Sequence, residues 1–199
     1  MSRVLAVAAV FTTLVTAACG QNARAGDDAS IDPKWTRMPE VTSVSEFPVD
    51  PTLTEALAQQ KAVDLLSEAL GASPHELSLV LGDQWNGDPL DPRLVGACIF
   101  GSDNPDDPQR LLIDYLVVGQ TRPPTDYLVD FARGWSELGW EVRTNPANRA
   151  IIQAISPDHF MLTASVATNG DTAFTIASQC FPGTNRNGAP PLPETIPHP

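Results

Sequence analysis

Apolar side chains recur with a helical period in two segments of the chain. Between Leu53 and Leu70 they fall mostly on one helix face, and between Leu128 and Leu138 they are spaced by three or four residues. A glycine follows each run, Gly71 and Gly139, at the place where a left-handed residue commonly ends a helix. The pattern therefore predicts two amphipathic helices.

The residues that flank these runs indicate where the helices begin and end. Thr52 and Glu55 fit a capping box at the start of the first helix, whose apolar face is interrupted at residues 59–61. Pro123 and Pro124 can open the second helix but cannot continue a strand. With Gly139 as its C′ residue, a Schellman motif would bring Trp140 against Trp135.

Short runs rich in β-branched and aromatic residues predict three strands between the helices and four after the second one. Asn169-Gly170 separates the last two runs and is a strong hairpin signal. The runs are 77–81, 94–100, 111–118, 140–143, 150–155, 160–167 and 172–180. This order predicts an α+β domain, with an antiparallel sheet of about six to seven strands, two helices packed on one face and one disulfide.

An apolar run, 4–18, follows Arg3 at the N-terminus and ends in Thr16-Ala17-Ala18-Cys19. The run fits a signal peptide and is shorter than the ~20 residues that a membrane-spanning helix needs. The small residues before Cys19 resemble the lipobox of bacterial lipoproteins. That resemblance implies cleavage before Cys19, a diacylglyceryl group on its thiol and attachment to the membrane. The alternative is an ordinary signal peptide with a chance cysteine near its cleavage site.

These features divide the chain into four parts: a lipoprotein signal peptide at 1–18, a lipidated N-terminus and flexible tether at 19–49, a single globular domain at 50–181, and a proline-rich disordered tail at 182–199. In the tail, Pro190-x-x-Pro193 is compatible with a ligand for an aromatic groove. A solvated spacer is the favoured interpretation.

Two cysteines remain once Cys19 is assigned to lipid. An even pair in an exported domain, Cys98 and Cys180, predicts one disulfide. A redox pair is the alternative, but the two residues lack the Cys-x-x-Cys spacing that lowers a thiol pKa. We expect a structural bond.

The net charge of −12 argues against nucleic acid as a partner, because an acidic surface repels phosphate backbones. No catalytic signature is present, and Asp158-His159 lies at an expected hairpin tip where a general base would be exposed to water. Two oxygen-rich loops, 83–91 and 103–107, do not match the 12-residue calcium loop and are typical of turns. We therefore expect no catalytic residue, no metal and no cofactor.

Asp114 is unusual because it lies in the middle of an apolar strand. It either pairs with an arginine or lines a polar pocket, and pairing is favoured. The available arginines are Arg93, Arg110 and Arg133. A candidate pocket combines Asp114 with three aromatic residues, Tyr115, Phe131 and Trp135, although aromatic residues at helical spacing are more often part of the core.

Several short motifs occur together in this chain: the lipobox at Cys19, Gly82-Asp83-Gln84-Trp85 after the first helix, Gly96-Ala97-Cys98 in a strand, and Cys180-Phe181 before the proline-rich tail. In this order they resemble the LppA-type lipoproteins of mycobacteria. The resemblance implies a cell-envelope lipoprotein without an assigned activity. It implies no functional residue beyond the lipidated cysteine and the cysteine pair.

The sequence leaves two functions open. The first is a non-catalytic lipoprotein, anchored through Cys19 to the outer face of the cell membrane, that binds another envelope protein. The second is a carrier or sensor that holds an apolar small molecule or lipid between helices and sheet. A cavity there would favour the carrier, and a filled core with an exposed apolar patch would favour the binding module. The oligomeric state is left open.

Overall fold

The structure is a computed structural model that describes residues 36–37, 47–82, 84–85, 88–89, 92–99, 102–145 and 148–199. All of them belong to one compact unit, residues 31–199. Among them, neither helix is long and apolar enough to cross a membrane.

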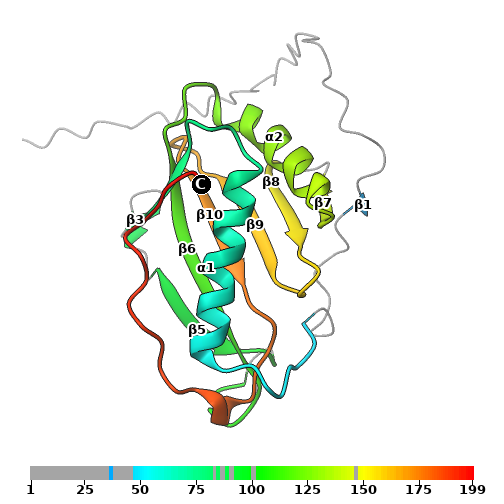
Figure 1. Ribbon diagram of the computed structural model, residues 1–199, viewed down its shortest axis with the longest axis vertical. Coiled ribbons are helices and arrows are strands. Elements are labelled where there is room, and N and C mark those ends of the chain that lie inside the picture. Colours follow the sequence, from blue (N-terminus) through cyan, green and yellow to red (C-terminus); the bar gives the residue numbers. More distant parts are fainter. Residues whose placement is uncertain are drawn as a thin grey trace, which may run out of the picture. The chain divides into compact units, whose positions relative to one another are not determined.

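A nine-stranded sheet forms the centre of the domain, with the strand order β1-β7-β8-β9-β10-β6-β2-β11 and with β5 also paired to β6 (Figure 1). Neighbouring strands are antiparallel, except that β1 is parallel to β7. A separate two-stranded pair is formed by β3 and β4. The strands are β1 (Thr36–Arg37), β2 (Ser78–Leu81), β3 (Gln84–Trp85), β4 (Asp88–Pro89), β5 (Arg93–Ala97), β6 (Gln109–Val118), β7 (Glu141–Asn145), β8 (Asn148–Ile155), β9 (Met161–Val166), β10 (Thr172–Ala177) and β11 (Thr195–Ile196).

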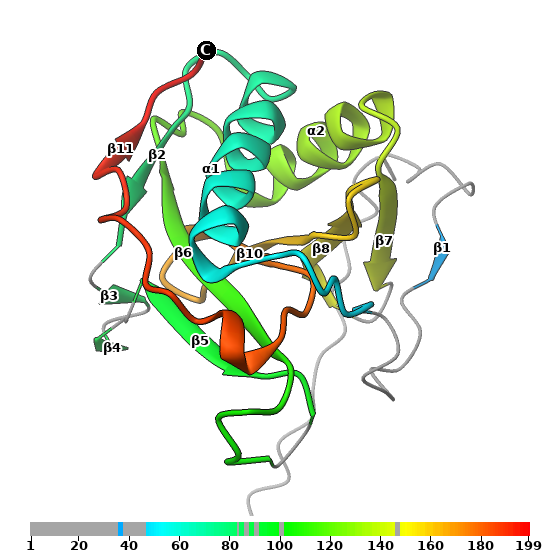
Figure 2. The ribbon, with the colours of Figure 1, turned by 60° about the horizontal axis from the view of Figure 1, so that its bottom comes forward.

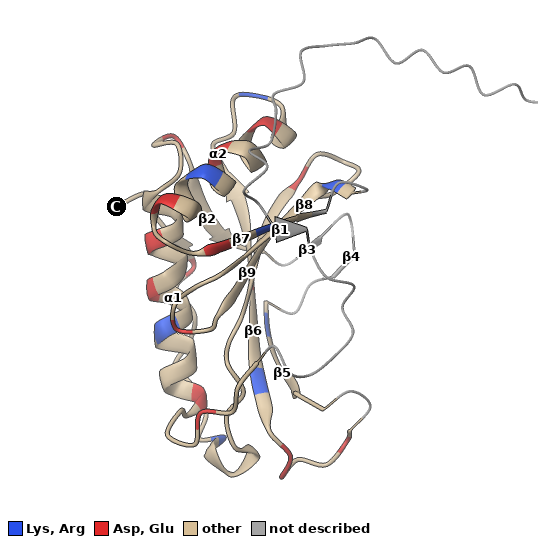
Figure 3. Cartoon of the chain, turned by 90° about the vertical axis from the view of Figure 1, so that its right-hand side faces the viewer, with Lys and Arg blue, Asp and Glu red and all other residues tan. Residues whose placement is uncertain are grey.

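The two helices, α1 (Glu55–Gly71) and α2 (Pro124–Glu137), both pack on the same side of this sheet (Figures 2 and 3). The predicted α+β architecture with one disulfide is therefore confirmed. Each of the seven predicted strands is present, and the two-residue strands β1 and β11 extend the sheet at its ends.

Strand β6 shows how the sheet separates its two faces. Leu111, Ile113, Tyr115 and Val117 are buried under the helices, whereas the residues between them are half-buried. Successive side chains of a strand point to opposite faces, so this alternation follows from the pleat. The apolar run at 111–118 is typical of a central strand packed on two sides, but only the helix side of β6 is fully buried.

The ends of α2 agree with the sequence prediction. Pro123 precedes its first residue, and Gly139 has a φ of +80° after its last turn. The amide of Trp140 donates to the carbonyl of Trp135 at 3.0 Å, and the two indole rings lie 6.2 Å apart. This is the predicted Schellman motif with its hydrophobic contact.

The ends of α1 differ from the prediction. Its N-cap is Thr54, whose hydroxyl accepts from the amide of Leu57 at 3.3 Å, so the expected capping box at Thr52 and Glu55 is wrong. Gly71 is the last helical residue and does not adopt the left-handed conformation of a C′ glycine. A Cβ at Gly71 would lie 2.9 Å from the ring of Pro199, so this glycine makes room for the C-terminal segment.

Residues 182–199 are not a solvated spacer, which corrects the expectation of a disordered tail. They run along α1 and include β11, which pairs with the edge of β2 (Figure 2). Ile196 is buried, and Leu192 packs against the core. Proline lacks an amide donor, but its carbonyl accepts hydrogen bonds, so a proline-rich segment can be held by donors from elsewhere in the fold.

Candidate functional site

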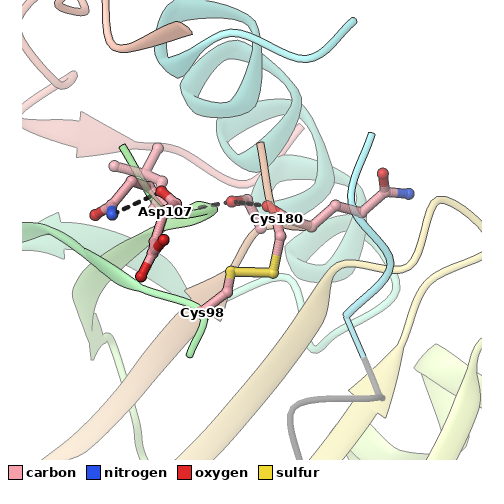
Figure 4. Close-up of a disulfide and its surroundings, with 7 residues drawn as sticks. Cys98, Asp107 and Cys180 are labelled. Carbon is pink, nitrogen blue, oxygen red and sulfur yellow. Dashed lines mark hydrogen bonds between the residues drawn. A yellow bond between two sulfur atoms is a disulfide. The ribbon is translucent and has the colours of Figure 1, made fainter. Parts of the chain in front are cut away.

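The predicted disulfide is present between Cys98, just after β5, and Cys180, three residues after β10 (Figure 4). The two Cα atoms lie 6.2 Å apart, and the residues are 82 positions apart in the chain. The carbonyl of Cys180 accepts from the amide of Asp50 at 2.8 Å. The bond therefore joins the end of β5 to the segment after β10, and the residues just before α1 are held against that segment.

The proposed lipidation site, Cys19, lies outside the described residues. So do most residues of the oxygen-rich loop 83–91. In the second loop, Ser102 and Asn104 bond to Asp107 as turn residues do. The described residues contain no group of three His, Cys, Asp or Glu side chains that could hold a metal ion.

The three aromatic residues of the candidate pocket lie in a filled core. Phe131 and Trp135 are fully buried and stack with their ring centroids 5.8 Å apart. Both rings meet Phe174 edge-on, with centroids 4.9 and 5.4 Å away. Tyr115 belongs to the same core cluster. These buried side chains pack against one another between helices and sheet.

Asp114 lies on the opposite face of the sheet from Tyr115, because the two are neighbours on β6. The hydroxyl of Thr175 donates to its carboxylate at 2.5 Å. Two of the arginines considered as partners reach other carboxylates: Arg93 lies 3.9 Å from Glu55, and Arg133 bonds to Asp130. The four candidate residues therefore do not meet in one pocket.

Asp114 belongs to a row of polar side chains that crosses the sheet face away from the helices, called here the open face. Asp114, Thr175, Thr163 and Gln153 are successive register partners on β6, β10, β9 and β8. Half-buried or exposed apolar side chains flank this row on both sides. They are Val80, Leu94, Leu112, Leu116, Val118, Ile151, Ile155 and Met161. Leu94 is the most exposed of them, at 48%.

The C-terminal segment lies in a groove between α1, β5 and β2, which we call the tail groove. Three side chains donate hydrogen bonds to carbonyls of the proline-rich stretch. Gln59 Nε2 donates to Pro190 at 2.6 Å, Tyr115 Oη to Pro193 at 2.7 Å, and Arg93 Nη1 to Ala189 at 3.4 Å.

Two further groups fix the segment on either side of this stretch. The carboxylate of Glu55 accepts from the amide of Gly188 at 3.2 Å, and the amide of Leu81 donates to the carbonyl of Glu194 at 2.9 Å. Gly188 has a φ of +71°, a left-handed conformation that suits glycine. The groove therefore binds the backbone of the segment more than its side chains.

Glu55, Gln59 and Arg93 were not identified as site residues from the sequence. A signal was nevertheless present, because Glu55 and Gln59 are only 4% and 3% exposed although they are polar and lie on the inner side of α1. The interruption at residues 59–61 in the apolar stripe was that signal. A buried polar side chain requires a hydrogen-bond partner, and the partner here is 131 positions away in the chain.

Two tyrosine hydroxyls have altered acidity. Burial raises the pKa of Tyr115 to about 12, so its hydroxyl remains a donor to Pro193 at neutral pH. Burial also acts to raise the pKa of Tyr127, but hydrogen bonds from Thr121 and Arg122 outweigh it, and the pKa is lowered. Tyr127 Oη also bonds to Glu76 at 3.1 Å, which ties α2 to the turn before β2.

Comparison of the chain with protein-family models, with curated proteins and with solved structures found no match in any of the three.

Proposed function

We propose that this protein is a non-catalytic, lipid-anchored cell-envelope protein that acts as a binding module for another envelope protein. In this proposal the chain is an LppA-type lipoprotein, attached through Cys19 to the outer face of the cell membrane. The order of motifs in the sequence supports the family, and the apolar run before Cys19 supports the anchor.

The single observation that carries the binding role is the contrast between the two sheet faces. The helix side is filled by stacked aromatic rings, which argues against the carrier alternative. The open face presents rows of apolar side chains around a polar row, with Leu94 and Val118 exposed by 48% and 37%. Mixed apolar and polar surfaces of this kind are suited to protein partners.

The anchor is tested by replacing Cys19 and separating membrane from soluble material. Cys19→Ala should leave the protein unprocessed or release it from the membrane fraction, because two acyl chains hold a protein far better than none. A variant that is still processed and still bound to the membrane would contradict the anchor.

The binding surface is tested by placing a photo-crosslinking amino acid at position 94 in cells that carry the membrane-bound protein. Position 57 is the matched control, because Leu57 is exposed by 53% on the outer side of α1. We expect a discrete adduct with one envelope protein from position 94 and none from position 57. The same adducts from both positions, or none from either, would reject the open face as the binding surface.

A further inference from the structure

The tail groove recognises features that belong to proline-rich segments in general. Proline offers no backbone donor, so a protein can hydrogen-bond to such a segment only through its carbonyls. The groove supplies these donors from three different elements: Gln59 from α1, Arg93 from β5 and Tyr115 from β6. None of the three contacts depends on the side chain of the residue that accepts.

Two of the three donors, Gln59 and Tyr115, are buried in the domain, and Arg93 is partly exposed. Gln59 is 3% exposed, and the ring of Tyr115 is fully buried in the core. A buried donor that loses its acceptor costs about 1–3 kcal/mol. An extended segment with carbonyls at these positions therefore satisfies donors that are buried while it is docked.

Beyond the prolines, the same segment adds a strand to the sheet. Thr195 and Ile196 pair with Val80 and Leu79, and the side chain of Ile196 is buried. Strand addition and recognition of an extended proline-rich stretch are two established ways of binding peptides. In this groove they follow one another along a single segment.

The resident segment does not fill the groove. An open hollow of about 360 Å³ remains beside it. Its lining comes from both the domain and the segment: Leu81, Pro92, Arg93, Ala189, Pro190, Pro191 and Leu192. A segment with larger side chains in the proline-rich part would have room there.

We propose that the tail groove is a recognition site for extended proline-rich segments of other proteins, and that residues 189–196 of this chain are its resident, competing occupant. A suitable partner segment has prolines over the part that faces Gln59 and Tyr115. It continues into a short strand with an apolar residue at the place of Ile196. This site is separate from the open face and does not depend on the lipid anchor.

The test uses a fluorescent peptide with the sequence of residues 186–199, titrated into the full chain and followed by fluorescence anisotropy. The resident segment competes at a high effective concentration, so the parent chain should bind the peptide weakly. Ile196→Asp in the chain removes the buried anchor of the resident segment and should raise peptide affinity by about tenfold or more. Thr195→Asp is the matched control, because Thr195 is exposed and its variant carries the same charge.

A second change addresses the groove itself. In the Ile196→Asp chain, Gln59→Leu should lower peptide affinity by about tenfold, whereas Gln60→Leu, at an exposed neighbour, should leave it unchanged. If Ile196→Asp does not fold, as judged by circular dichroism, Ile196→Ala replaces it in the same comparisons.

Equal peptide affinity of the parent chain and the folded Ile196 variant would overturn the proposal, as would equal affinity of the Gln59→Leu and Gln60→Leu chains. A concentration-dependent dimer of the parent chain that Ile196→Asp abolishes would assign the groove to a second copy instead, and would overturn its assignment to other proteins.

Discussion

The two helices cover the same sheet face, but they are held there in different ways. The inner face of α2 is apolar and aromatic, and Phe131 and Trp135 pack directly on Phe174 of β10. The inner face of α1 contains two buried polar residues, Glu55 and Gln59, which bond to the C-terminal segment and to Arg93 of β5. Helix α2 is held on the sheet by its own apolar side chains, whereas α1 also depends on contacts with the C-terminal segment.

This difference explains why the sequence predicted α2 more accurately than α1. The ends of α2 depend on local signals, the prolines before it and Gly139 after it. At α1, Glu55 accepts from Gly188, and Gly71 makes room for Pro199. Two residues that the sequence assigned to helix caps thus contact residues more than a hundred positions away.

The largest expected effect is at the aromatic centre of α2. Trp135→Ala should lower the free energy of unfolding by about 3–5 kcal/mol, because it leaves a cavity among buried rings. Chemical denaturation measures this loss. Val129→Ala, at a position of α2 exposed by 38%, is the control and should change stability by less than about 0.5 kcal/mol. Similar losses for both variants would show that α2 is not held by its aromatic stripe.

The second effect concerns the disulfide, whose Cys180 contacts the residues just before α1. Replacing Cys98 and Cys180 together with serine should lower the free energy of unfolding by about 4 kcal/mol, as expected for a bond across 82 positions. The same denaturation experiment under reducing conditions should give the parent protein a similar loss. An unchanged midpoint in both cases would mean that the bond does not stabilise the fold.

A smaller effect is expected at the polar inner face of α1. Gln59→Ala should cost about 1–3 kcal/mol, since it removes the donor to the Pro190 carbonyl. Hydrogen exchange should show the loss at the amide of Leu81, which donates to Glu194 in the docked segment. Gln60→Ala serves as the control, because Gln60 is exposed on the same helix. If hydrogen exchange at the Leu81 amide is the same in Gln59→Ala as in the parent, Gln59 does not help to hold the C-terminal segment in place.

The smallest effect is expected at Tyr115, where Tyr115→Phe should cost about 1 kcal/mol at neutral pH by removing the hydrogen bond to Pro193. Burial raises the pKa of Tyr115 to about 12, above its ordinary value of about 10. The neutral form of Tyr115 is therefore favoured in the folded state. Its contribution to the free energy of unfolding is complete below pH ~10 and is lost as the pH rises towards ~12. Denaturation of both proteins across this range should show a steeper loss for the parent. Parallel curves would contradict the altered pKa.

Much of the fold was visible in local patterns. The helical period, the strand runs, the Asn169-Gly170 turn and the even pair of cysteines predicted the α+β architecture and its disulfide. Each of these signals lies within a few neighbouring residues or, for the disulfide, in the number of cysteines, so it can be read without the fold. The pocket expectation failed for a reason also present in the sequence, because Asp114 and Tyr115 are adjacent on one strand and must face opposite sides.

Only the tertiary structure decided how the C-terminal segment is used. From its composition, residues 182–199 were expected to be a solvated spacer, and proline-rich sequence does not reveal whether its carbonyls have partners. The donors to those carbonyls come from α1, β5 and β6, which the fold brings together beside β2. Local patterns report the conformation that a segment prefers, whereas the hydrogen bonds that hold this segment join residues far apart in the chain.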